Sequence, residues 1–172
     1  MSNPDAGKLT AEQQARVGER LAGVWVIDAE RSESMEPFFK WIGIPWAIRK
    51  LIGSGKKGVT TITHDKDLEG IRLHTAAVKT MEKVMLFAGE YEFTAGDGST
   101  VKEVMRVLDA DNGTIQSVAK NNKKKEGWFV TTMTPVDAAS GGREILQVIE
   151  IREGSAEGTA VVRIERVFVP KP

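Results

Sequence analysis

The chain contains no cysteine and only two histidines among its 172 residues. The lack of thiols excludes a disulfide framework and thiolate catalysis, and it removes most ligand sets for zinc. The sequence also lacks a Gly-x-Ser-x-Gly motif, a phosphate-binding glycine loop and a carboxylate–histidine cluster with a recognisable signature. We therefore predict no catalytic residue, no metal site and no cofactor.

Net charge and long apolar runs are missing as well. Lysine and arginine total 24, and so do aspartate and glutamate, which argues against a nucleic-acid binder that relies on positive charge. No apolar run approaches the roughly 20 residues that cross a bilayer. The first residues are polar, without the basic and then apolar segments of a signal peptide. The expectation is a monomeric, cytoplasmic protein.

The stretch 23–63 predicts a strand, two short helices and a second strand. Its first residues alternate with the period of two that strands have, and we expect Trp25 in the core. Ser34 can cap the first helix, Gly43 can end it, and Pro45 suits the start of the second. The two helices carry apolar residues at helical spacing, namely Met35, Phe38, Phe39 and Ile42, then Trp46, Ile48 and Ile52. So short a hairpin must lie on a larger apolar surface, as a lid or plug.

Two segments precede this stretch. Residues 1–8 are predicted to be disordered, and residues 9–21 to form a helix whose start has a capping box of Thr10 and Gln13. This helix packs against the main domain or, alternatively, binds a partner. The predicted division is an N-terminal segment 1–21 and a ligand-binding domain 22–172.

From residue 57 onward the chain predicts one strand after another. Short alternating runs are separated by turn sequences rich in glycine, asparagine and aspartate. This spacing is typical of an antiparallel meander, and about ten such strands are expected to close into a barrel. A barrel of more than about eight strands encloses a cavity. The predicted fold is therefore mainly β: an up-and-down barrel of about ten strands, capped by the helix-turn-helix lid, with an extra N-terminal helix.

Several motifs, in their common order, resemble those of the intracellular lipid-binding proteins, the fatty-acid-binding and retinoid-binding family of the calycin superfamily. They lie at 23–27 (Gly-x-Trp-x-Ile), 33–35, 38–39, 43–51 (ending near Arg-Lys), 88–93 with 97–98 (Asp-Gly), 112–115 (Asn-Gly-Thr-Ile) and 166–168 (Arg-x-Phe). The resemblance implies a lidded barrel that binds and transports a fatty acid or related lipid. The chain departs from the family pattern at Phe168, where the family has the tyrosine of its carboxylate clamp. It departs again near Thr131 or Thr132, where many members have a second inward arginine.

The family's clamp arginine corresponds to Arg166. Alternation places it on one face with Ile164 and Phe168, whereas Arg163 shares the other face with Glu165. A guanidinium in an apolar cavity would take an anionic ligand as its partner. Two alternatives remain: a structural arginine paired with a carboxylate, or Arg163 as the inward residue. The predicted ligand-binding residues are Arg166, Phe168, Phe38, Phe39, Ile42, Trp46, Ile48, Met85, Met105 and Met133.

The lid region is basic although the chain as a whole is neutral. Arg49, Lys50, Lys56 and Lys57, with Lys40 nearby, form either a solvated face or a surface that contacts anionic membranes transiently.

Three other functions stay open. The first is an enzyme acting on a lipophilic substrate, as in the luciferase domains of dinoflagellates, which use similar lidded barrels. The second is a haem-binding barrel that would use His64 or His74. The third is a packed scaffold without a cavity.

Overall fold

The computed structural model describes residues 8–54, 58–77, 79–121 and 126–172. They form three helices and ten strands, which confirms the predicted mainly β class. The helices are α1 (Ala11–Leu21), α2 (Glu36–Trp41) and α3 (Trp46–Ser54). The strands are β1 (Gly23–Ile27), β2 (Val59–Asp65), β3 (Gly70–Ala76), β4 (Met81–Leu86), β5 (Glu90–Thr94), β6 (Thr100–Asp109), β7 (Thr114–Asn121), β8 (Gly127–Asp137), β9 (Arg143–Arg152) and β10 (Ala160–Pro170).

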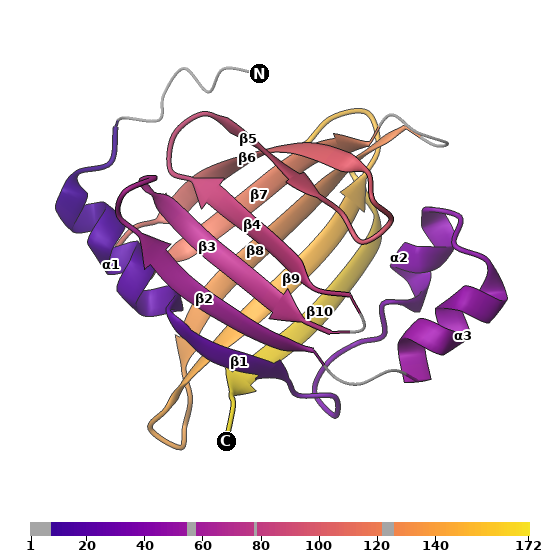
Figure 1. Cartoon of the computed structure of the whole chain (residues 1–172), viewed down its shortest axis with the longest axis horizontal. Helices are drawn as coiled ribbons and strands as arrows, with labels where there is room; N and C mark the ends of the chain where they lie inside the picture. The colour runs from indigo at the N-terminus through magenta and orange to yellow at the C-terminus, as the bar shows by residue number, and fades with distance from the viewer. Residues whose placement is uncertain (1–7, 55–57, 78, 122–125) are drawn as a thin grey trace.

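All ten strands belong to one antiparallel sheet with the order β4-β3-β2-β1-β10-β9-β8-β7-β6-β5. Apart from β4 and β5, strands that follow one another in the chain are paired, and β1 pairs with β10 to join the first and last strands of the meander. The sheet curls into a barrel (Figure 1) in which β4 and β5 approach each other without ladder hydrogen bonds. The predicted barrel is therefore confirmed, but its hydrogen-bonded wall is open between these two strands.

The helices lie at opposite ends of this barrel. Figure 1 shows α1 at one end, and α2 with α3 at the other. The link from β1 to α2 carries the chain to the lid end, and β2 carries it back toward α1. We call these ends the α1 end and the lid end.

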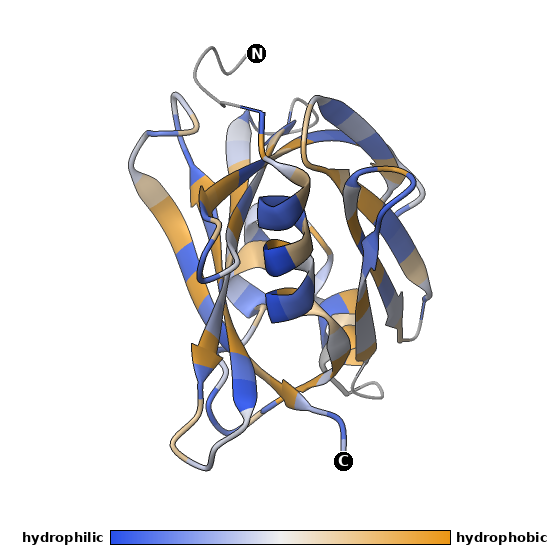
Figure 2. Ribbon diagram, turned by 90° about the vertical axis from the view of Figure 1, so that its left-hand side faces the viewer, coloured by the Kyte–Doolittle hydropathy of each residue, from blue (hydrophilic) through white to orange (hydrophobic). Residues whose placement is uncertain are grey.

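Helix α1 closes its end with apolar side chains. Val17 and Leu21 are completely buried, and the indole Nε1 of Trp25 donates a hydrogen bond to the Leu21 carbonyl oxygen over 3.0 Å. Gly18 lies so close to β2 that a Cβ added there would be 2.6 Å from the Cβ of His64. Figure 2 shows α1 lying across the end of the barrel, with hydrophilic turns facing outward. The predicted core position of Trp25, which is 2% exposed, is confirmed.

Polar contacts hold α1 in this position. Arg20 donates from Nε to the Asn112 carbonyl oxygen over 3.2 Å and forms an ion pair with Asp137 over 3.1 Å. Arg16 pairs with Asp111 in the turn between β6 and β7. The predicted capping box is confirmed, since the Thr10 hydroxyl accepts from the Gln13 N–H and the Gln13 side chain accepts from the Thr10 N–H. The segment 1–7, predicted to be disordered, lies outside the described residues.

The main apolar core fills the α1 end of the barrel. It joins buried residues of α1 to inward-facing residues of the strands: Val17, Leu21, Trp25, Ile62, Ile71, Leu73, Met85, Tyr91, Met105, Ile115, Met133, Ile145 and Phe168. Within the described ranges, no helix is both long and apolar enough to span a membrane.

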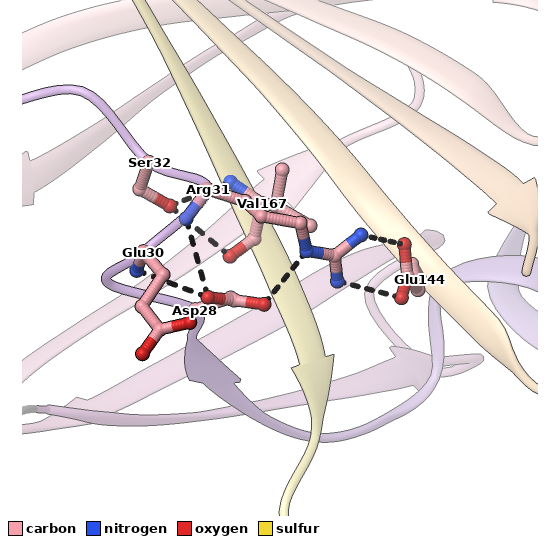
Figure 3. Close-up of polar contacts among 6 residues, drawn as sticks. All are labelled: Asp28, Glu30, Arg31, Ser32, Glu144 and Val167. Carbon is pink, nitrogen blue, oxygen red and sulfur yellow. Dashed lines mark hydrogen bonds and ion pairs between the residues drawn. The ribbon is translucent and has the colours of Figure 1, made fainter.

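The link between β1 and α2 is fixed by Arg31 (Figure 3). Its guanidinium contacts both oxygens of Glu144 on β9, at 3.1 and 2.8 Å, and Asp28 at 2.7 Å. Hydrogen bonds from Arg31 lower the pKa of both the Asp28 and the Glu144 carboxyl groups. The neighbouring Ser32 hydroxyl accepts from the Val167 N–H over 2.9 Å. These contacts fasten the base of the lid to β9 and β10.

Candidate functional site

Arg166 lies on the inner face of β10. It is the register partner of Gln147 on β9, which in turn pairs with Met133, a residue of the main core. Because side chains alternate along a strand, Arg166 shares its face with Phe168, and its guanidinium carbon is 5.5 Å from the centroid of that ring. The guanidinium is thus held against an aromatic face inside the barrel.

No carboxylate compensates this buried charge within the described residues. Burial alone lowers the pKa of Arg166 to about 10, so the group remains protonated at neutral pH. Arg163, by contrast, is outward and exposed, and it pairs with Glu165 and with Glu150. Of the two arginines that the sequence left open, Arg166 is therefore the one that faces the interior.

Gln147 is a site residue that the sequence analysis missed. Its Oε1 is buried and has no hydrogen-bond partner among the described residues. A primary amide carries donors as well as an acceptor, so this side chain can serve a polar ligand group beside Arg166. The sequence does show a polar residue alternating with Ile145 and Ile149. Its place beside Arg166, however, becomes visible only from the register of β9 with β10.

The inner face is not uniformly packed. Four inward residues of β8, β9 and β10 are only partly buried, namely Phe129, Thr131, Gln147 and Arg166. Four predicted ligand contacts are instead almost fully buried in or beside the α1-end core, namely Met85, Met105, Met133 and Phe168. The inner face is therefore less tightly packed on the lid side of this core than within it.

Helix α2 packs at the lid end against β8 and β10. The Phe38 ring lies 5.3 Å from that of Phe129, and the Trp41 ring 6.0 Å from it. Gly127 makes room for Trp41, since a Cβ at this glycine would be 2.7 Å from the indole. Phe39 and Ile42, also predicted ligand contacts, are half-buried in or next to this helix.

Helix α3 departs from the prediction. Trp46 is 63% exposed and Ile48 50% exposed, so the expectation that they point into the interior is wrong in this structure. Leu51 and Ile52 are exposed too, at 70% and 43%. Helical spacing reveals an apolar face but not which surface covers it, and here the strands leave that face uncovered.

The two histidines lie on opposite faces of neighbouring strands. His64 points inward beneath α1, and its Nε2 is buried without a partner among the described residues. His74 pairs in register with Thr61 and Glu82 on the outer face. The described part of the chain contains no cluster of three or more groups that could hold a metal ion.

Comparison with known proteins relates this geometry to solved structures. No protein-family model matches the sequence, and no curated protein matches it. Apo lipid binding protein 8 of Caenorhabditis elegans matches with a TM-score of 0.69 and 18% identity, over 89% of this chain and 96% of that one. A Schistosoma mansoni fatty acid binding protein in complex with arachidonic acid matches with a TM-score of 0.69 and 16% identity, over 91% and 99%.

A mutant of the REP1-NXSQ fatty acid transporter matches with a TM-score of 0.63 and 17% identity, over 89% of this chain and 99% of that one. These neighbours are lipid-binding and fatty-acid-binding proteins, and the alignments cover nearly their whole chains. The sequence identity is low, so the likeness concerns the fold. The chain thus has the ten-stranded, helix-lidded barrel fold of the fatty-acid- and lipid-binding proteins.

Proposed function

We propose that the protein binds a hydrophobic molecule with an anionic head, a fatty acid or related lipid, non-covalently inside the barrel. The observation that carries the proposal is Arg166, an inward and largely buried cation without a carboxylate partner among the described residues. A ligand carboxylate would supply the missing partner, and Gln147 would donate beside it. The proposal extends to lipid transport by a monomer in the cytoplasm, without a catalysed reaction.

The apolar tail would occupy the space between Arg166 and the lid. Phe38 and Phe39 of α2 and Ile42 just after it would contact the tail from the lid, and Met85, Met105 and Met133 would contact it from the main core. Burying an acyl chain contributes about 0.8 kcal/mol per methylene before the cost of fixing the chain is subtracted. The known neighbours support this reading, because one of them was solved with arachidonic acid.

Titration of the delipidated protein tests this proposal. We expect a long-chain fatty acid to bind at least tenfold more tightly than the alcohol of equal length, because only the acid carries a charge for Arg166. Native mass spectrometry of the purified protein should in addition detect a co-purified lipid. If no fatty acid or retinoid binds above background, the proposal fails.

The exposed face of α3 favours a second role, contact with anionic membranes during ligand transfer. Trp46, Ile48 and Leu51 offer apolar side chains, and Lys50 lies with its Nζ 5.8 Å from the Trp46 ring centroid. Arg49 is tied to Glu36 over 2.7 Å, so it is partly neutralised. The other two predicted membrane-contact residues, Lys56 and Lys57, lie outside the described residues.

Replacing Leu51 with serine should weaken binding to vesicles containing phosphatidylserine by about tenfold, because a large apolar side chain no longer enters the interface. Vesicle sedimentation at low and high salt measures the effect. Leu108→Ser is the matched control: Leu108 is 55% exposed near the α1 end, so its replacement should leave binding unchanged. Equal binding by both variants and the unaltered protein would contradict the membrane role.

A further inference from the structure

A second polar cluster lies inside the barrel, on the wall formed by β4, β5 and β6. The Lys83 Nζ forms an ion pair with the Glu103 Oε1 over 2.7 Å, and the Tyr91 hydroxyl donates to the same oxygen. The Lys83 side chain is only 12% exposed and that of Glu103 8%. Burial and the Glu103 carboxylate raise the pKa of Tyr91, so its hydroxyl keeps its proton and remains a donor.

Register places all three side chains on the inner face. Lys83 pairs with Leu73 of the main core, and Glu103 pairs with Tyr91 on one side and with the buried Ala119 on the other. In the strand order, β4, β5 and β6 lie across the barrel from β10, which carries Arg166. The interior therefore has charged side chains on two opposing walls.

The cluster has capacity for a further partner. An ammonium group has three N–H donors, and in the described residues Lys83 gives one to Glu103 while its Nζ lies 4.8 Å from the Phe93 ring centroid. A saturated acyl chain placed here would remove water from the ion pair and return no hydrogen bond, which costs free energy. An oxygen atom on that chain would accept a hydrogen bond from Lys83 instead.

Solvent reaches this cluster through the opening between β4 and β5. A groove of about 480 Å³ runs there, lined by Leu68, Glu82, Lys83, Val84, Leu86, Tyr91 and Glu92. Two of the three cluster residues, Lys83 and Tyr91, thus border both the groove and the interior. A polar ligand atom at this point could replace its hydrogen bonds to water by hydrogen bonds to Lys83 or Tyr91 close to the groove.

We propose that Lys83, Tyr91 and Glu103 form a second polar subsite, which binds a hydroxyl or carbonyl oxygen on the chain of the ligand. The ligand class is then an oxygenated fatty acid, with its carboxylate at Arg166 and its second oxygen at Lys83. This inference rests on the proposed function. That proposal specifies the anionic head group of the ligand, and this one specifies an oxygen atom on its chain.

The test compares stearate with a series of oxostearates that place the ketone at successive positions along the chain. Isothermal titration calorimetry of the delipidated protein should show one position that binds about tenfold more tightly than stearate, which is the effect of one hydrogen bond from a charged donor. Oxostearates with the ketone elsewhere should bind no better than stearate.

The double variant Lys83→Met/Glu103→Gln removes both charges and nearly conserves side-chain volume, so Glu103 is not left as an unpaired buried charge. We expect it to lose the preference for the ketone while binding stearate at least as tightly as before. Lys120→Met/Glu126→Gln is the control, because this pair, at 2.9 Å, is exposed. It should keep the preference.

The possible results separate the two proposals. Equal affinity of the unaltered protein for stearate and for every oxostearate overturns the subsite and leaves the fatty-acid proposal standing. A preference that survives in Lys83→Met/Glu103→Gln also overturns it. If neither stearate nor any oxostearate binds, the proposed function fails first, and the subsite fails with it. The comparison in the unaltered protein decides the matter even if the double variant does not fold.

Discussion

Replacing Arg166 with methionine should weaken fatty-acid binding by roughly ten- to a hundredfold and at the same time stabilise the ligand-free protein. A hydrogen bond to a charged group contributes about 1.5–3 kcal/mol, and the carboxylate would lose that contact. Without ligand, the guanidinium is a largely buried charge that no carboxylate in the described residues compensates. Its removal should therefore raise the free energy of unfolding by about 1–3 kcal/mol.

Calorimetry with a fatty acid and urea unfolding of the delipidated protein measure the two effects separately. Methionine fits the same space and can pack against Phe168, so the variant is expected to fold. Arg163→Met is the matched control on the same strand, because Arg163 faces outward and is 52% exposed. It should change neither quantity appreciably.

The opposite signs of the two effects make this prediction specific. A purely structural arginine would destabilise the protein when removed and would leave ligand affinity unchanged. Loss of stability in Arg166→Met, with unaltered fatty-acid binding, would thus show that the side chain has a protein partner and is not the ligand anchor.

Replacing Leu21 with alanine should lower the free energy of unfolding by about 2–5 kcal/mol, the range for removing a large buried aliphatic side chain. Leu21 is completely buried in the main core, and its carbonyl accepts the hydrogen bond from Trp25. The truncation leaves a cavity where α1 meets the strands. Thermal and urea unfolding measure the loss.

Glu19→Ala, on the exposed side of the same helix, controls for general effects on helix stability and should change the free energy of unfolding by less than about 0.5 kcal/mol. If Leu21→Ala were as mild as Glu19→Ala, α1 would be a loosely attached appendage. The predicted alternative of a partner-binding helix would then regain support.

Much of the fold could be predicted from the sequence because its signals are local. The capping box at Thr10 and Gln13, the alternation around Trp25 and the glycine–aspartate turns each depend on neighbours a few residues away. The number and direction of the strands follow from the spacing of these signals. The register that joins β1 to β10 does not follow from them, because it pairs residues far apart in the chain.

Part of the candidate site could likewise be predicted from local signals, and part could not. Alternation assigned Arg166 and Phe168 to one face, whereas the orphaned oxygen of Gln147 and the ion pair of Lys83 with Glu103 depend on register between strands. Trp46 and Ile48 were misassigned, because an apolar helix face looks the same in sequence whether a barrel or water covers it.

The sequence by itself determined the helices and strands, their order along the chain, and the strand face on which Arg166 lies. These features depend on backbone propensity and side-chain alternation, which operate within a few residues. Only the folded chain decided which end α1 closes, that β4 and β5 stay unpaired, and which polar groups face one another across the interior. The physical reason is that burial and charge compensation depend on distances between strands, and those distances are fixed only when the sheet curls and β1 pairs with β10.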